Sequence, residues 1–387
     1  MVHRFVEAQL GAFRQLARVG GLPLRALPGA GLLDERAAIS GYVPQGRTSP
    51  GGSFRILRMA GGRWLGLNLA RPTDLASVPA LTLGTLPEPD GDRPDWPALD
   101  AWAAGRDAES VYAQALLLDI PVALVDPEPA RVSRLRTFPR RLPHGTRLPD
   151  RAPCDRPLVA DLSALWAVPL CAHLLGLAGG RVLKIESTAR PDGARRGPAA
   201  FFDLLHGGHE GVAFDFADPA EIARLRALLT HADIVIEASR PRALAQLGVR
   251  PAEIAAERPG QTWVSITAYG RTGQYANRPG FGDDVAAAAG LVGRSADGAP
   301  AVYRDAVADP LTGVHAAVAA LTGYVTGGGV MFDVRMHDTA ALAAAYDPDR
   351  HEATPPANPT RRPVAGRAPR LGEHTEAVLT EFGICPA

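Results

Sequence analysis

The chain has 387 residues, with 41 Lys and Arg against 41 Asp and Glu, so its formal net charge at pH 7 is zero. This length exceeds what one small core organises and predicts two domains. A balanced charge argues against a general nucleic-acid-binding or membrane-surface role. The three cysteines have neither metal-ligand spacing nor a disulfide pattern, so a reducing cytoplasm is the expected location. We also expect no membrane span, because no apolar run reaches ~18 residues.

Residues 1–150 are expected to form a small α+β domain that ends in a linker. Phe5–Val19 has the apolar spacing of an amphipathic helix. Two apolar runs flank Gly61-Gly62 and predict a β-hairpin over 53–70. The remaining expected elements of this part are a helix over 97–118 interrupted at Gly105, a strand over 119–125, and a Pro- and Arg-rich linker over 126–156.

From residue 157 onward, short apolar strands alternate with helices. This pattern is typical of an α/β fold with a doubly wound parallel sheet, and we expect such a Rossmann-like domain over 151–346. The expected strands are 159–163, 181–186, 213–216, 232–237, 262–267 and 329–335. The expected helices between them include 167–177, 219–229, 251–257 and 337–346. Residues 347–387 are expected to be an irregular C-terminal segment.

One stretch, residues 302–321, combines an extended start, a turn at Asp309-Pro310 and an alanine-rich helical run. Asp309 stands where a helix N-cap is expected, with Pro310 at the first helical position. The simplest interpretation is therefore that Asp309 caps a helix. A carboxylate at a helix N-terminus is also favoured in its ionised form by the amide dipoles.

Four longer motifs carry a resemblance that covers roughly 157–346 and 367–384. They are VADLSALWAVPLCAHLLGLAGGRVLKIE (159–186), ADIVIEASRPRALAQLGV (232–249), VSITAYGRTGQYANRPGF (264–281) and APRLGEHTEAVL (368–379). On these motifs the chain resembles the class III CoA-transferase family, the group of formyl-CoA transferase, carnitine CoA-transferase and α-methylacyl-CoA racemase. Residues 53–130 resemble the small domain of that family, which there normally follows the catalytic segment and here precedes it.

The resemblance implies a chemical role for Asp309. In the family, the Asp of a Gly/Ala-Asp-x-x-x-Gly segment before a helix attacks the thioester of acyl-CoA, and Asp309 and Gly313 match that pattern. The implied function is transfer of CoA between an acyl-CoA and a carboxylic acid through an aspartyl anhydride and an aspartyl-CoA thioester. An attacking carboxylate must be ionised, so capping and catalysis are compatible.

The resemblance also implies a set of CoA-contacting residues. Arginine side chains suit phosphates because their planar fork donates two hydrogen bonds. Alternative roles remain open: Trp166 is equally suited to core packing, and Arg195-Arg196 to a solvated loop. His315 is either close to the site or a satisfied core histidine, and His374 is expected to be structural. The implied CoA-contacting residues are Trp166, Ala167, Lys184, Arg190, Arg195, Arg196, Ser239, Arg240 and Tyr269.

Departures from the family pattern define an alternative function. A basic pair of the family is replaced by His209-Glu210, and an Asn-Phe pair by Ala238-Ser239. Phe281 replaces the histidine of the racemases, which argues against racemisation. These changes allow a catalytically degenerate member that binds CoA or a partner without turnover. For either function the resemblance implies a homodimer, acyl-CoA and carboxylic acid ligands, no metal and no permanently bound cofactor.

Overall fold

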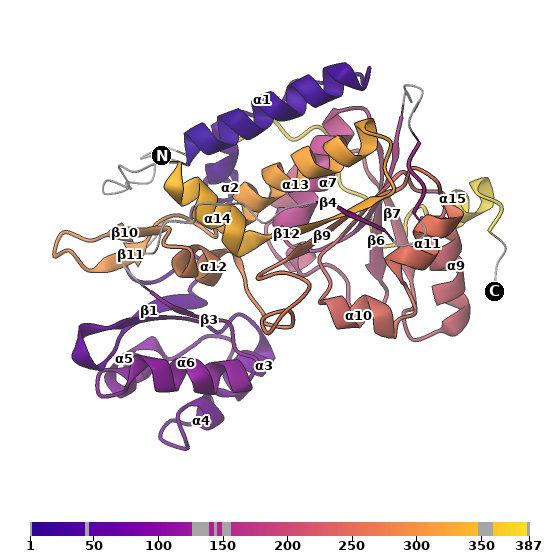
Figure 1. Ribbon diagram of the computed structural model, residues 1–387. Coiled ribbons are helices and arrows are strands. Elements are labelled where there is room, and N and C mark those ends of the chain that lie inside the picture. The colour runs from indigo at the N-terminus through magenta and orange to yellow at the C-terminus, as the bar shows by residue number, and fades with distance from the viewer. Residues whose placement is uncertain are drawn as a thin grey trace.

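The computed structural model describes residues 2–42, 46–125, 139–142, 145–148, 156–346 and 359–384. Its largest feature is a seven-stranded sheet with the order β4-β12-β9-β8-β5-β6-β7 (Figure 1). Neighbouring strands are parallel except that β4 runs antiparallel to β12. The large parallel sheet predicted from the alternating pattern is confirmed. The strands are β4 (Pro139–Arg141), β5 (Leu158–Leu162), β6 (Arg181–Ser187), β7 (Glu210–Phe214), β8 (Ile234–Glu237), β9 (Thr262–Thr267) and β12 (Val330–Arg335).

The strand order contains one switch point. From β5 the chain adds β6 and β7 on one side, and it then returns to add β8, β9 and β12 on the other. The carboxyl ends of β5 and β8, at Leu162 and Glu237, are therefore neighbours at the point where the winding reverses. In open α/β sheets a ligand crevice is expected at this edge.

Alternate side chains of the central strands enter two different cores. Ile234 and Ile236 pack on one face of the sheet, whereas Val235 packs on the other. This period of two is what a strand buried on both faces requires. One face is covered by α1 (His3–Val19), α7 (Ala167–Leu177), α8 (Ala199–His206), α12 (Gly282–Ala288), α13 (Ala308–Val325) and α14 (Met336–Ala345). The other is covered by α9 (Pro219–Leu229), α10 (Pro241–Gln246), α11 (Pro251–Glu257) and α15 (Thr375–Glu381).

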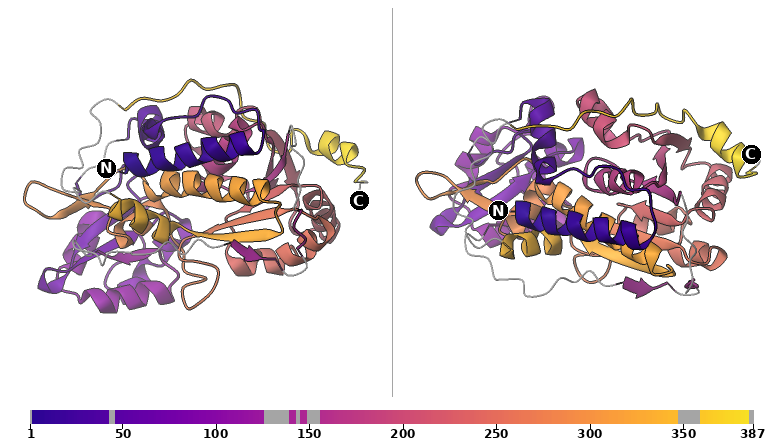
Figure 2. Two further views of the ribbon diagram at one scale, coloured as in Figure 1. Left: turned by 45° about the horizontal axis from the view of Figure 1, so that its top comes forward. Right: turned by 90° about the horizontal axis from the view of Figure 1, so that it is seen from above.

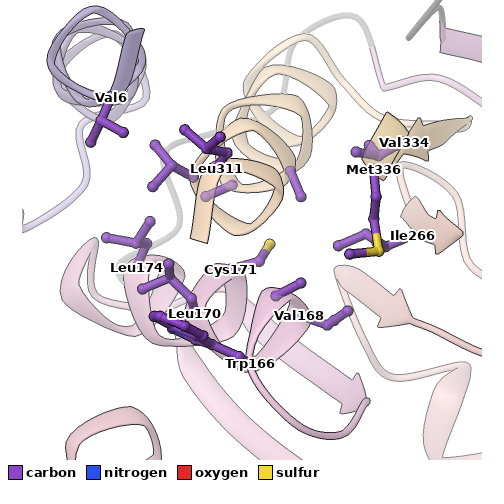
Figure 3. Close-up of a cluster of buried hydrophobic side chains, with 14 of the residues drawn as sticks. Val6, Trp166, Val168, Leu170, Cys171, Leu174, Ile266, Leu311, Val334 and Met336 are labelled. Atoms are coloured by element: carbon purple, nitrogen blue, oxygen red, sulfur yellow. The ribbon is translucent and has the colours of Figure 1, made fainter. Parts of the chain in front are cut away.

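Helix α13 lies at the centre of the first core. Leu311 of α13 lies between Val6 of α1 and Leu174 of α7 (Figure 3). Gly313 permits the close approach to α7, because a Cβ at that position would clash with the carbonyl oxygen of Ala167. The glycine one helical turn after Asp309 is thus explained by helix packing.

The amphipathic helix predicted over Phe5–Val19 is confirmed as α1, which lies along α13 in all views (Figures 1 and 2). Phe5, Leu10 and Phe13 of its apolar stripe are fully buried, whereas Val19 at its end is exposed. Packing therefore groups α1 with the parallel-sheet part, whereas the sequence grouped it with residues 1–150. The reason is that its apolar stripe covers α13 and not the small sheet.

A second, antiparallel sheet has its own hydrophobic cluster. The predicted hairpin is confirmed, with Arg58 of β1 opposite Trp64 of β2. The far side of this sheet, including Phe54 and Ile56, packs with Ala287 of α12. That the two parts are separate domains stays a prediction. The unit consists of β1 (Phe54–Arg58), β2 (Trp64–Asn68), β3 (Val122–Leu124), α3 (Pro72–Ala76), α4 (Val78–Leu81), α5 (Trp96–Ala103) and α6 (Ala108–Leu117).

Several segments differ from expectation. Residues 139–141, inside the predicted linker, form the edge strand β4, whose short Pro-Arg-Arg sequence carries no strand pattern. The C-terminal segment contains α15 (Thr375–Glu381), which begins at the last residue of the LGEHT motif. The extended residues before Asp309 belong to a hairpin of β10 (Val292–Arg294) and β11 (Pro300–Val302).

Three further short elements are η1 (Ala30–Asp34), α2 (Glu35–Ser40) and η3 (Gly193–Arg196). None of the described helices is long and apolar enough to cross a membrane.

Candidate active site

Asp309 is the second residue of α13 and does not cap the helix. The helix begins at Ala308, the preceding residue is Val307, and no side chain caps the helix. The prediction that Asp309 is the N-cap, with Pro310 first in the helix, is therefore wrong. The physical reason is the turn before the helix, where Ala306 has φ 42° and its carbonyl accepts the N–H of Asp309 at 2.9 Å. This turn starts the helix earlier than the Asp-Pro pair suggests.

The start of α13 lies beyond the carboxyl ends of the strands. Helix α13 connects β9 to β12, which are parallel. Near its end, Gly323 approaches Thr262, the first residue of β9. Its beginning, with Asp309, therefore points to the opposite edge, where parallel sheets place their ligands.

The carboxylate of Asp309 is partly exposed and lies directly against a glycine backbone. A Cβ on Gly282 would be 2.7 Å from Oδ2 of Asp309 and 2.5 Å from the carbonyl oxygen of Ala306. Among the described residues, none donates a hydrogen bond to this carboxylate or forms an ion pair with it. The group is held in place by packing, and its oxygens stay available to a ligand.

Further acidic groups surround Asp309, with one arginine among them. Arg36 of α2 binds Asp305 through two hydrogen bonds, of 2.6 Å from Nε and 2.5 Å from Nη2. Asp283 accepts the N–H of Ala306 at 2.9 Å. Asp284 accepts a hydrogen bond from the side chain of Asn68, at the end of β2, at 2.9 Å. The small sheet, α2, α12 and α13 thus all contribute to one site.

The pKa values of these carboxyls are raised. Burial raises the pKa of Asp309 to about 7, with Arg36 opposing the shift and Asp305 adding to it. Burial and the nearby Asp305 raise the pKa of Asp283 to about 8. Burial raises the pKa of Asp284 to about 6 despite its hydrogen bonds. Burial thus opposes the preference for the ionised form that the helix dipoles give Asp309, and the net pKa is raised.

The residues expected to contact CoA after β5 serve packing in this structure. Trp166 is 2% exposed; its ring meets Phe201 edge-on at 5.3 Å and is covered by the guanidinium of Arg36 at 4.7 Å. Ala167 is buried, and its carbonyl faces Gly313. The core-packing alternative for Trp166 thus has direct support.

The cations in and after β6 fall into two groups. Lys184 is fully buried, where its ammonium donates to the carbonyl of Ser163 and lies 3.0 Å from a carboxylate oxygen of Asp192. Arg195 forms an ion pair with Glu186, with Nη2 2.5 Å from Oε2. In contrast, Arg190 and Arg196 are exposed and have no ion pair within the part of the chain that the structure describes.

The residues after β8 and β9 lie where the small sheet meets the larger one. Arg240 binds Asp119 at 3.1 and 2.7 Å, which links it to the turn before β3. The N–H of Ser239 donates to Glu237 at 2.7 Å. Tyr269 lies under the guanidinium of Arg278 at 3.9 Å, and burial raises the pKa of its hydroxyl. Arg240 and Ser239 are therefore already partnered, whereas the Tyr269 hydroxyl has no hydrogen-bond partner among the described residues.

Neither singled-out histidine is seen to contact Asp309. His315 projects toward α1, with Nδ1 3.1 Å from Oε1 of Gln9, and burial lowers its pKa to about 4. His374 accepts the N–H of Gly211 through Nδ1 at 3.0 Å, which fits the structural role expected for it. No group of three or more potential metal ligands occurs within the described ranges.

Sequence reasoning missed several members of the site. Asp305 is four residues before Asp309 and could have been found by its proximity. Asp283-Asp284 follows the glycine-containing Pro-Gly-Phe-Gly run, which also marks a close backbone approach. Arg36 comes from a stretch without periodicity, so nothing in the local sequence indicated it.

Comparison with known proteins identifies the family. Residues 157–371 match the model of CoA-transferase family III. The chain belongs to this family. A succinyl-CoA–D-citramalate CoA-transferase of Chloroflexus aurantiacus is 29% identical over 44% of this chain and 44% of its own length. A succinate–glutarate CoA-transferase of Agrobacterium fabrum is 28% identical over 52% of this chain and 55% of its own.

The match to solved structures is similarly partial. A CaiB/BaiF family protein from Brucella suis is 26% identical, with a TM-score of 0.46 over 49% of this chain and 55% of that chain. The chain thus spans about half of the length of the relatives it matches. The resemblance to class III CoA-transferases is confirmed by the match to the family model.

Proposed function

We propose that this protein is a CoA-transferase that moves CoA between an acyl-CoA thioester and a carboxylic acid, with Asp309 as the nucleophile. One observation carries the proposal: the carboxylate of Asp309 is partly exposed at the edge formed by the carboxyl ends of the strands and has no partner among the described residues. Family membership supports the same chemistry, because relatives such as those of C. aurantiacus and A. fabrum are named CoA-transferases.

The proposed reaction conserves atoms and charge without an added cofactor. An oxygen of Asp309 attacks the thioester carbonyl, and the C–S bond breaks. CoA departs as a thiolate, and the product on the enzyme is a mixed anhydride of Asp309 and the donor acid. The thiolate then attacks the aspartyl carbonyl, which releases the donor acid and leaves an aspartyl-CoA thioester. An acceptor carboxylate attacks this thioester, and the released thiolate attacks the new acyl carbonyl. The products are the new acyl-CoA and free Asp309.

The acidity of Asp309 predicts how this reaction depends on pH. Only the ionised carboxylate can attack, and burial raises its pKa to about 7. The first step is therefore expected to accelerate as the pH rises through neutrality. A carboxylate stripped of hydrogen-bond donors is also less stabilised in the ground state, which favours attack.

For the CoA phosphates we propose Arg190 and Arg196, which are exposed after β6 and lack ion pairs among the described residues. Lys184, Arg195 and Arg240 are engaged by carboxylates, so we assign them to the scaffold. A homodimer and a division into a small domain and a Rossmann-like domain also remain proposals. The chemical class of the acceptor is a carboxylic acid.

The test is intact-mass analysis after incubation with a panel of acyl-CoA thioesters, including succinyl-CoA. The wild-type protein should gain the mass of CoA less one water, and Asp309→Asn should not, because an amide cannot form the anhydride. Asp297→Asn, an exposed change at the tip of the β10–β11 hairpin, is the matched control and should behave as wild type. Thermal stabilisation by acyl-CoA without any adduct would instead support the non-catalytic alternative.

A further inference from the structure

Two ion pairs join the segment around residue 35 to the turn that precedes Asp309. In one pair the segment supplies the carboxylate, and in the other it supplies the arginine. Asp34 pairs with Arg304, and Arg36 pairs with Asp305. Asp34, Arg304 and Asp305 are each less than 10% exposed. The sequence separation is about 270 residues in both pairs, so this contact is purely tertiary. The segment is thereby fixed in one register against the turn.

The residue between them fixes the same segment from another side. Glu35 binds Arg362 of the C-terminal stretch at 2.6 and 3.0 Å, and Arg362 also lies 2.7 Å from Nε2 of His173. Three consecutive residues of this segment therefore bind three different arginine–carboxylate partners. Of these, Arg36 is the one whose guanidinium influences Asp309.

We propose that Arg36 is a positioning residue for the reaction, which holds the turn before Asp309 in place and supplies the cation that Asp309 faces. This proposal rests on the proposed function for its catalytic meaning. It concerns a residue from outside the region matched by the family model, which begins at residue 157.

The geometry of Arg36 suits a positioning role. Its planar fork binds both oxygens of Asp305, and the same guanidinium stacks on the ring of Trp166 at 4.7 Å. A lysine has neither the fork nor the flat face. Between Asp305 and the helix, Ala306 is held at φ 42°, a conformation that costs a non-glycine residue roughly 1 kcal/mol or more unless its surroundings enforce it. The ion pair provides that enforcement on one side, and the hydrogen bond to Asp283 on the other.

Arg36 also affects the pKa of Asp309 through its charge. The charged groups that shift the pKa of Asp309 are Arg36 from α2, Asp305 from the turn and Asp284 from α12. Arg36 is the one cation among these, so its loss leaves several carboxyls without a counter-charge. The pKa of Asp309 would then rise, because an opposite charge at close range favours the ionised form.

The experiment compares Arg36→Gln with Arg362→Gln. The titration of Asp309 is followed by carbon NMR of protein with 13C-carboxyl aspartate, assigned with Asp309→Asn, and the pH midpoint of CoA-adduct formation is measured in parallel. Arg36→Gln should raise both midpoints by about one pH unit. Arg362→Gln removes a similar ion pair from the neighbouring residue, so it should lower stability without moving either midpoint.

A third variant reverses the sign. Asp305→Asn removes a carboxylate that raises the pKa of Asp309 and frees Arg36, so both midpoints should fall. This variant also decides the outcome if Arg36→Gln does not fold. Unchanged NMR midpoints in the folded Arg36 or Asp305 variants would overturn the inference. A wild-type protein that titrates as expected but forms no adduct would refute the proposed function and leave the electrostatic role of Arg36 standing.

Discussion

Lys184 and Asp309 are both charged groups that the resemblance placed in the functional site, yet their surroundings differ. Lys184 is completely enclosed, and its ammonium is bound to a backbone carbonyl and to Asp192. The carboxylate of Asp309 is partly open and has no partner among the described residues. One cation is already neutralised within the protein, whereas one anion is left for a ligand.

The charge balance around each group explains the difference. Around Lys184, an ammonium faces Asp192 at 3.0 Å and Asp161 at 3.9 Å, and these contacts raise the pKa of Lys184 against the effect of burial. Around Asp309, the guanidinium of Arg36 is the counter-charge of several carboxyls, and burial raises the pKa of Asp309 to about 7. An ionised group that the protein does not satisfy is a functional candidate, and a satisfied one is part of the scaffold.

The strongest test of this comparison is Lys184→Met. Removal of the ammonium leaves Asp161 and Asp192 buried without a counter-charge, so the free energy of unfolding should fall by about 3–5 kcal/mol. Urea unfolding followed by circular dichroism measures it. Arg63→Met, which breaks an exposed pair with Glu109, is the control and should cost less than about 1 kcal/mol. If Lys184→Met kept full stability but bound acyl-CoA more weakly, Lys184 would be a ligand-binding residue and not part of the scaffold.

The second test adds one methyl group beside Asp309. In Gly282→Ala the Cβ would lie 2.5 Å from the carbonyl oxygen of Ala306 and 2.7 Å from Oδ2 of Asp309, so the turn before the helix and the carboxylate must move. Because a displacement of about 1 Å can cost roughly 100-fold in rate, adduct formation should slow by about that factor. Gly11→Ala, at a position of α1 with open space around it, should leave the rate unchanged. Equal rates for both variants would show that the position of this carboxylate is unimportant.

Much of the fold, but less of the site, could be predicted from sequence. The short apolar run of β8 and the apolar stripe of α1 are local patterns, and both elements form as expected. Arg36 reaches Asp305 across 269 residues, and no local pattern carries that information. The resemblance places Lys184 among the CoA-contacting residues, and its residue type does not reveal that Asp161 and Asp192 lie around it.

The third test asks whether the raised pKa of Asp309 lowers the free energy of unfolding at high pH. Its pKa rises from 3.8 to about 7 on folding, so the native protein retains a proton that the unfolded chain releases near pH 4. The contribution of this group to stability is therefore present at low pH and lost as the pH rises from about 4 to about 7. Asp309→Asn should be more stable than wild type at pH 8, by on the order of 1 kcal/mol, and the advantage should vanish toward pH 4. A pH-independent difference between the two melting temperatures would contradict the raised pKa.

The smallest expected effect separates the two neighbouring arginines of η3. Arg196 is exposed without an ion pair among the described residues, whereas Arg195 is bound to Glu186 and to the carbonyl of Pro369. If Arg196 contacts a CoA phosphate at the solvent-exposed edge, Arg196→Gln should raise the KM for acyl-CoA about 2- to 5-fold, since one exposed charge pair contributes up to about 1 kcal/mol. The same change should leave kcat and the melting temperature unaltered.

Arg195→Gln should give the opposite result. Its guanidinium joins the carboxylate of Glu186 to the C-terminal stretch and lies over the ring of Phe202 at 4.5 Å, so its loss removes internal contacts. The melting temperature should fall while the KM for acyl-CoA changes little. An added salt series sharpens the distinction, because an exposed phosphate contact weakens with ionic strength, whereas a partly buried ion pair is screened much less. If salt raised the KM equally for wild type and Arg196→Gln, Arg196 would not face the phosphate, and this edge would bind CoA through other groups.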